Sequence, residues 1–408
     1  MPESATRALR QNRDFGRLWI GQAISGMGSQ ITGIATPLLA LALTHSPAKA
    51  GLIGVARSIA YPLAMLPAGV LADRLDRRRM MIVCATGRMA ATASIPIALA
   101  LGRPTLAQLL AASLIDAVLL TASGLAERGM IAQLVPAEAL GEAITVNEGR
   151  YAAAMVAGPP AGGALFGIAR TLPFVADAAS YLAALAALLR LHPHAPQEPP
   201  GLDAPRAAVG AQIAEGLRWL AGRPFLRDGA LLYAAANMIL AAISLLALLI
   251  ARRHGASSAA VGGAFAIIGA GALIGAALAN PLRRRISGRA AVLIEPWFYV
   301  IFIPLLLIAH SPVAIGLVVA ATMLPLILSS SVLVGRRLAL APDHLRGRVM
   351  ASAGFVGSAL TWIGPLAIGF LYQYAGEDAT ILALSGVCLL VALAATLARG
   401  FREVPAAP

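Results

Sequence analysis

The chain is poor in charge: 12% of its 408 residues are Asp, Glu, Lys or Arg, while 59% are hydrophobic. A soluble domain carries about a quarter charged residues, so the composition excludes an ordinary soluble fold. The apolar residues form runs of about 20 residues or more, the length that a helix needs to cross the hydrocarbon core of a bilayer. A transmembrane barrel would instead show short alternating segments. We therefore expect an all-α integral membrane protein.

Cysteine and lysine are scarce as well. The two cysteines, Cys84 and Cys388, lie in apolar runs without metal-binding or redox spacing, so we expect apolar side chains rather than a disulfide. The only lysine is Lys49, and no Gly-x-x-x-x-Gly-Lys-Ser/Thr loop is present, which excludes ATP as a direct fuel through a P-loop. The histidines show no metal spacing beyond His192 and His194. We expect no cofactor, no metal and no enzymatic activity.

Apolar segments recur along the whole chain. If the N-terminus lies in the cytoplasm, the cytoplasmic loops and termini together hold 24 of the 32 Lys and Arg residues. This is a strong positive-inside bias. We therefore expect a multi-pass protein of the inner (plasma) membrane with both termini cytoplasmic. The net charge of +13 is spread over short loops near anionic lipid, so nucleic acid is not an expected partner. The predicted spans are 17–43, 49–72, 78–101, 105–126, 140–169, 171–191, 229–251, 257–280, 290–309, 312–334, 348–372 and 379–398.

The two halves of the chain are related. A shift of 206 residues aligns residues 136–169 with 342–375 without a gap, with nine of 34 positions identical. The same shift aligns Gly69 with Gly275 and the arginines at 77–79 with those at 283–285. Because 206 residues contain six predicted spans, both halves have the same orientation. This plan resembles the parallel repeats of major facilitator transporters.

The resemblance predicts twelve transmembrane helices in two six-helix bundles, over residues 1–191 and 229–408. Residues 192–228 are expected to form a cytoplasmic linker. Five prolines between residues 192 and 206 prevent a helix at its start. Ile213, Leu217 and Leu220 then recur at helical spacing, which predicts a short amphipathic helix on the cytoplasmic surface.

The loop after the second span reads Gly69-Val-Leu-Ala-Asp-Arg-Leu-Asp-Arg-Arg-Arg79. It resembles the signature loop of the major facilitator superfamily, Gly-x-Leu-Ala-Asp-Arg-x-Gly-Arg-Arg, with Asp76 where the Gly usually stands. The Asp form resembles the branch of enterobactin-type siderophore exporters and multidrug exporters. We expect Gly69 to permit close helix packing and Asp73 to latch the cytoplasmic side near the start of span eleven. The expected gating residues are Gly69, Asp73, Arg74, Arg77 and Arg78.

Span five contains Gly158-Pro-Pro-Ala-Gly-Gly163, which resembles the Gly-Pro-x-x-Gly-Gly motif of antiporters in this superfamily. Small residues allow close helix packing, and prolines bend a helix. The alternative interpretation is ordinary packing, because Gly and Pro are frequent in membrane helices. The residues of this antiporter-like motif are Gly158, Pro159, Gly162 and Gly163.

Ionisable residues inside the predicted spans are the candidates for energy coupling, because such residues are costly in a bilayer. Asp116, near the middle of span four, is the candidate proton carrier; the alternative is a static polar partner of Arg88. Asp177 is expected to be structural and to reach Arg170, and Glu295 is expected at the interface. The expected charge network is Arg88, Glu127, Arg128, Glu148 and Arg150. The candidates for a polar substrate cavity are Gln22, Ser25, Gln30, Arg57 and Asn237.

These features predict a secondary transporter that exports a small amphipathic molecule, a drug-like compound or a metabolite such as a siderophore, in exchange for protons. The resemblance implies alternating access by rocking of the two halves. Its expected partners are the substrate, protons and the lipid bilayer, and we expect a monomer. Nutrient uptake by the same fold and a non-transporting membrane sensor or scaffold remain as alternatives.

Overall fold

The computed structural model describes residues 9, 12–192, 209–342 and 345–401, apart from the side chains of residues 66, 70, 72–74, 209–214 and 346. Every regular element among them is a helix. Eleven of these helical segments are long and apolar enough to cross a membrane. The predicted second span coincides with a further helix, α3 (Pro47–Arg74), of 28 residues. The expected all-α membrane fold is confirmed.

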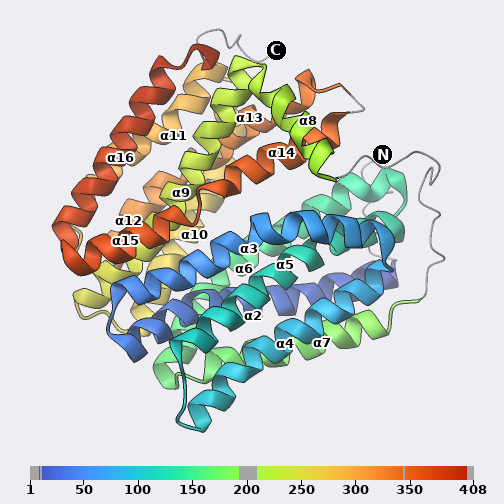
Figure 1. Cartoon of the computed structure of the whole chain (residues 1–408), viewed down its shortest axis with the longest axis vertical. Helices are drawn as coiled ribbons and strands as arrows, with labels where there is room; N and C mark the ends of the chain where they lie inside the picture. The colour runs from blue at the N-terminus through green and yellow to red at the C-terminus, as the bar shows by residue number, and fades with distance from the viewer. Residues whose placement is uncertain (1–8, 10–11, 193–208, 343–344, 402–408) are drawn as a thin grey trace. The chain divides into compact units, whose positions relative to one another are not determined.

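The chain forms two compact units (Figure 1). Unit 1 comprises residues 1–44 and 60–205, and unit 2 comprises residues 45–59 and 206–408. The boundary at residues 59 and 60 lies inside α3, so this helix belongs partly to each unit. The division into 1–191, 192–228 and 229–408 stays a prediction.

The other helices of unit 1 are α2 (Arg13–Thr44), α4 (Arg77–Ala100), α5 (Leu106–Leu134), η1 (Ala137–Ala139), α6 (Leu140–Ile168) and α7 (Leu172–Leu189). Those of unit 2 are α8 (Val209–Ala221), α9 (Pro224–Arg253), α10 (Ser258–Arg283), α11 (Gly288–Phe302), η2 (Ile303–Leu307), α12 (Pro312–Met323), α13 (Leu326–Leu340), α14 (Arg346–Ala359), α15 (Ile363–Tyr374), α16 (Glu377–Leu397) and η4 (Arg399–Phe401).

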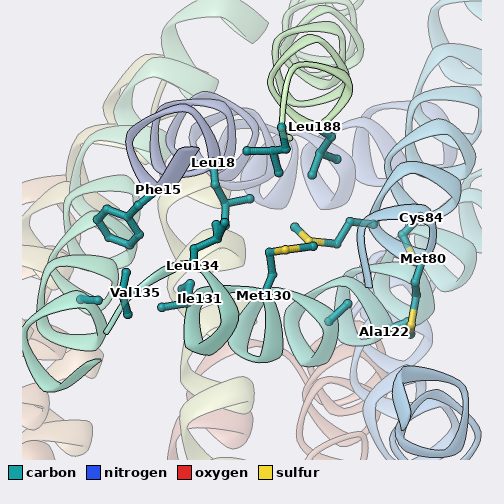
Figure 2. Close-up of a cluster of buried hydrophobic side chains, with 14 of the residues drawn as sticks. Phe15, Leu18, Met80, Cys84, Ala122, Met130, Ile131, Leu134, Val135 and Leu188 are labelled. Atoms are coloured by element: carbon teal, nitrogen blue, oxygen red, sulfur yellow. The ribbon is translucent and has the colours of Figure 1, made fainter. Parts of the chain in front are cut away.

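In unit 1, α2 packs against α6 and α7, and α4 packs against α5 and α7. One end of these helices is filled by buried apolar side chains (Figure 2). Cys84 belongs to this cluster, and both cysteines are free and buried, as their apolar setting predicts. The residues labelled in Figure 2 are Phe15, Leu18, Met80, Cys84, Ala122, Met130, Ile131, Leu134, Val135 and Leu188.

Three spans of unit 2 are interrupted, a feature that their hydropathy did not predict. The predicted span 312–334 is divided at Leu324 and Pro325 into α12 and α13, and span 348–372 is divided before Gly364-Pro365 into α14 and α15. The ninth span changes from α11 to the 3₁₀ helix η2 around Pro304. Proline lacks the backbone N–H donor and clashes with the preceding turn, so it favours such breaks, which hydropathy does not register.

The amphipathic helix after the linker is α8, which packs on α14 (Figure 1). Leu220 lies in an apolar cluster with Leu345 and Val349, and Arg348 forms an ion pair with Glu215. Gly216 lies close to the backbone of Arg348. The described part of the apolar face of α8 therefore packs on α14 within unit 2, and the predicted position of this helix on the cytoplasmic surface stays a prediction.

The start of α3 packs on α15 within unit 2. A Cβ atom at Gly54 would lie 2.6 Å from Cβ of Pro365, and one at Gly369 would lie 2.9 Å from the carbonyl oxygen of Pro47. The side-chain oxygen of Gln373 accepts hydrogen bonds from the hydroxyl of Ser46 and, at 3.2 Å, from the backbone N–H of Ala48. Small residues thus bring these two helices into backbone contact.

The antiporter-like motif packs α6 on α2, and α6 continues unbroken through Pro159 and Pro160. A Cβ atom at Gly162 would lie 2.5 Å from the carbonyl oxygen of Ile31, while one at Gly167 would have no atom of the described residues within 4 Å. We expect Gly162→Ala to lower the free energy of unfolding by about 1–3 kcal/mol, the usual cost of overpacking. Thermal unfolding of purified protein in detergent measures this loss.

Gly167→Ala is the matched control on the same helix. Alanine is a better helix former than glycine, so this variant should unfold at the wild-type temperature or slightly above it. Equal unfolding temperatures for the two variants would contradict the close packing of α6 on α2.

Candidate functional site

The best-connected polar group of unit 1 is an ion pair between α4 and α5. Arg88 Nε lies 2.8 Å from Asp116 Oδ1, and the two side chains are only 6% and 9% exposed. Arg88 also donates to the hydroxyl of Ser29 on α2 at 2.9 Å, and the hydroxyl of Tyr181 on α7 donates to Asp116 at 3.2 Å. The guanidinium carbon lies 4.9 Å from the centre of the Tyr181 ring. Four helices therefore meet at one buried pair of charges.

Asp177 extends this network toward α2. Its carboxylate accepts a hydrogen bond from Thr32 at 2.8 Å, and the Ser180 hydroxyl donates to its backbone carbonyl at 2.7 Å. A Cβ atom at Gly28 would collide with Asp177 and Ser180, so glycine is needed where α2 passes. The sequence predicted Arg170 as the partner of Asp177. Arg170 is exposed, and the carboxylate of Asp177 contacts Thr32 and Ser180 instead.

A second buried pair joins α5 and α6. Arg150 donates to Glu127 at 2.8 Å, with side chains 11% and 12% exposed. Glu127 and Arg128 were predicted to end the fourth span, but α5 continues to Leu134, shortly before Pro136. Arg128 and Glu148 are exposed, yet close enough for their charges to act on Glu127. The structure thus separates the predicted network into the Arg150–Glu127 cluster and the Arg88–Asp116 pair.

Arg77 and Arg78 of the signature loop donate to helix carbonyl groups of unit 1. Arg77 donates to the carbonyl of Gly129 at 2.7 Å, and Arg78 donates to the carbonyls of Leu188 and Leu189 at 2.7 and 2.8 Å. Cations at the C-terminal end of α7 complement its dipole and its free carbonyl groups. Arg78 therefore caps α7.

Asp76, the residue that departs from the superfamily pattern, caps the start of α4 by accepting from the backbone N–H of Arg79 at 2.8 Å. Among the described residues, no atom lies within 4 Å of a Cβ built at Gly69, so the predicted close approach is not seen there. Its repeat counterpart Gly275 does lie against the backbone of Leu324. The side chains of Asp73 and Arg74 lie outside the described residues, and their gating role stays a prediction.

The predicted cavity residues have different settings. Ser25 is buried, and Gln30 packs against Gly158. Asn237 donates to the carbonyl of Gly357 at 3.1 Å, which joins α9 to α14. Gln22 and Arg57 are half-buried. Contact with substrate stays a prediction for all five.

The sequence did not predict the setting of two buried charged side chains in unit 2. Glu295, expected at the interface, is 4% exposed and accepts a hydrogen bond from Tyr299 at 3.0 Å. Arg337 is also 4% exposed, lies 5.6 Å from the centre of the Tyr233 ring, and is 3.4 Å from the carbonyl oxygen of Gly229. Glu295 and Tyr299 are four residues apart, a spacing that places both on one helix face and would have indicated this contact.

The chain is similar to known membrane proteins along most of its length. Residues 4–407 match the family of transmembrane secretion effectors. The chain is 27% identical to the multidrug efflux pump Tap of Mycolicibacterium fortuitum over 413 residues, which cover 93% of this chain and 94% of the pump.

Solved structures with the same fold include a bacterial homologue of the human lysosomal transporter Spinster in an inward-facing, unoccupied conformation. Its TM-score is 0.72 at 16% identity, covering 97% of this chain and 98% of that chain. A mutant of the nucleoside transporter NupG gives a TM-score of 0.73 at 12% identity, covering 94% and 98%.

The fold and the sequence relatives are those of major facilitator transporters, which are not enzymes. Within that class, the chain belongs to the family of transmembrane secretion effectors. The predicted membership of the major facilitator superfamily is thereby confirmed.

The Arg88–Asp116 pair makes a prediction about stability. Asp116→Leu leaves a buried guanidinium without its carboxylate and should cost about 3–5 kcal/mol of folding free energy. The double variant Arg88→Met/Asp116→Leu removes both charges and should recover most of this loss. Thermal unfolding in detergent compares the two. A double variant no more stable than Asp116→Leu would contradict the inferred mutual compensation of the two charges.

Proposed function

We propose that the protein exports small amphipathic molecules, drug-like compounds or a secreted metabolite such as a siderophore, in exchange for protons. The observation that supports export is the similarity to a multidrug efflux pump over more than nine-tenths of both chains. The Gly-Pro-x-x-Gly-Gly motif, which packs α6 on α2, agrees with an antiporter. Nutrient uptake uses the same fold, but no sequence relative described above favours it.

Asp116 is the proposed proton carrier. Its carboxylate is buried, and its charge is balanced by Arg88. A carboxylate that loses such a partner inside a membrane is costly as an anion and is stabilised by binding a proton. Release of Arg88 from Asp116 would therefore accompany proton uptake, and renewed pairing would accompany proton release. Tyr181 and Ser29, which contact the two charged groups, would keep them aligned in the paired state.

Dye efflux from energised cells tests this coupling. We expect wild-type efflux to stop on addition of a protonophore, and Asp116→Asn to give only the background rate, because the amide does not carry a proton. Arg88→Met/Asp116→Leu separates coupling from stability, since its two apolar side chains leave no charge unpaired. This double variant should also fail to drive efflux although it folds.

Glu138→Gln, at an exposed acid in η1, is the control and should export at the wild-type rate. Efflux that persists in the folded double variant would place the proton carrier elsewhere, with the buried Glu295 as the next candidate. Dye accumulation in energised cells, rather than expulsion, would contradict export itself.

We propose a monomer in the inner membrane with both termini in the cytoplasm. Lys49 and Arg283 are both exposed. In this orientation Lys49 lies on the outer side of the membrane and Arg283 on the cytoplasmic side. In a background with Cys84→Ala and Cys388→Ala, Lys49→Cys should react with a membrane-impermeant maleimide in intact spheroplasts. Arg283→Cys should react only after permeabilisation. The reverse pattern would invert the proposed orientation.

A further inference from the structure

Two histidines and a glutamate from three separate turns meet at one end of unit 2. His254 caps the C-terminus of α9, His310 lies between η2 and α12, and Glu377 is the first residue of α16. Gly376, with a φ of 85°, adopts the left-handed conformation that turns the chain into α16. These residues lie far apart in the sequence, so their spacing gave no indication of a common site.

The three side chains present their ligand atoms to one another. Nε2 of His254 lies 3.0 Å from Oε1 of Glu377, and the ligand atoms of all three residues lie within 4.8 Å of one another. The two imidazole rings have their centres 4.6 Å apart. Ligands bound at about 2.0–2.1 Å to one tetrahedral zinc ion lie roughly 3.3 Å apart. Small rotations of the exposed His310 would bring the set to that spacing.

Glu377 is held in place by groups outside this triangle. Its Oε2 accepts a hydrogen bond from the hydroxyl of Tyr372 at 2.8 Å and lies 3.5 Å from Nε of Arg253. The hydrogen bond from Tyr372 directs Oε1 toward the histidines, as outer partners of metal-bound carboxylates do. The Glu377 side chain is 7% exposed and that of His254 is 31% exposed, so the carboxylate is fixed while the site stays open to solvent.

We propose that His254, His310 and Glu377 bind a divalent transition-metal ion, with Zn²⁺ as the best match. Two imidazole nitrogens and one carboxylate oxygen form a donor set that zinc accepts, with water as the fourth ligand. A bound ion would hold together three turns: the one after α9, the one between η2 and α12, and the one at the start of α16. The positive charge of Arg253 would repel the bound ion. Its side chain is 56% exposed, however, and has room to turn into solvent.

Zinc binding to the full chain, purified in detergent with a tag free of histidine and stripped of metal, tests the site. Isothermal titration should show one zinc ion per wild-type chain. His254→Gln/His310→Gln should lose this binding, while Arg253→Gln should bind zinc more tightly than wild type because a nearby positive charge is removed. Tyr372→Phe should weaken binding by roughly 10–100-fold, the usual effect of losing an outer hydrogen bond.

His45→Asn is the matched control: His45 is an exposed histidine outside the cluster, and asparagine tolerates its φ of 50°. It should bind zinc as wild type does. Zinc binding that survives in His254→Gln/His310→Gln would assign the ion to other residues and overturn the proposal. Absence of titratable zinc binding in both wild type and Arg253→Gln would overturn it as well.

Discussion

The buried pairing of Arg88 with Asp116 is the interaction on which the polar interior of unit 1 depends. Either charge alone would be costly in a lipid-embedded bundle, because little water is available to solvate it. Together they leave hydrogen-bonding positions that Ser29 and Tyr181 occupy from two further helices. The pair therefore fixes the relative register of α2, α4, α5 and α7, while apolar packing alone would tolerate small displacements along the helix axes.

Close backbone contact is the second constraint. Lipid is as apolar as leucine, so hydrophobic burial adds little to helix association in a membrane, and association relies on packing and hydrogen bonds. The chain meets this condition with glycines at the crossings of α2 with α6 and α7, of α10 with α12, and of α3 with α15. Prolines in the C-terminal spans divide several helices into two shorter pieces. Glycine thus marks the places where helices touch, and proline accompanies the breaks in the C-terminal spans.

The span positions, the transporter superfamily and the contribution of Asp116 and Arg88 to one site were accessible from sequence. Hydropathy and the repeat determine the first two, and the burial cost of charge indicates the third. The sequence did not reveal the contributions of Tyr181, Ser29 and Thr32. Ordinary polar residues on different helices show no common pattern in the sequence before those helices are packed together. The histidine–glutamate group was missed because its members come from three distant turns. Asp76 departed from the superfamily loop for a local reason: it caps α4.

The division of α3 between two units has a mechanical consequence. Gly51 and Gly54 attach its first turns to Pro365 of α15, while residues from Ala60 onward belong to unit 1. Pro62 has no N–H to donate to the carbonyl of Ser58, so the turn that spans the boundary lacks one of its hydrogen bonds. Any reorientation of one unit against the other must then be absorbed by bending α3 or by parting it from α15. The weakened turn from Ser58 to Pro62 offers the bend at the lower cost, so α3 is at once one of the covalent connections between the units and a point at which the chain can bend.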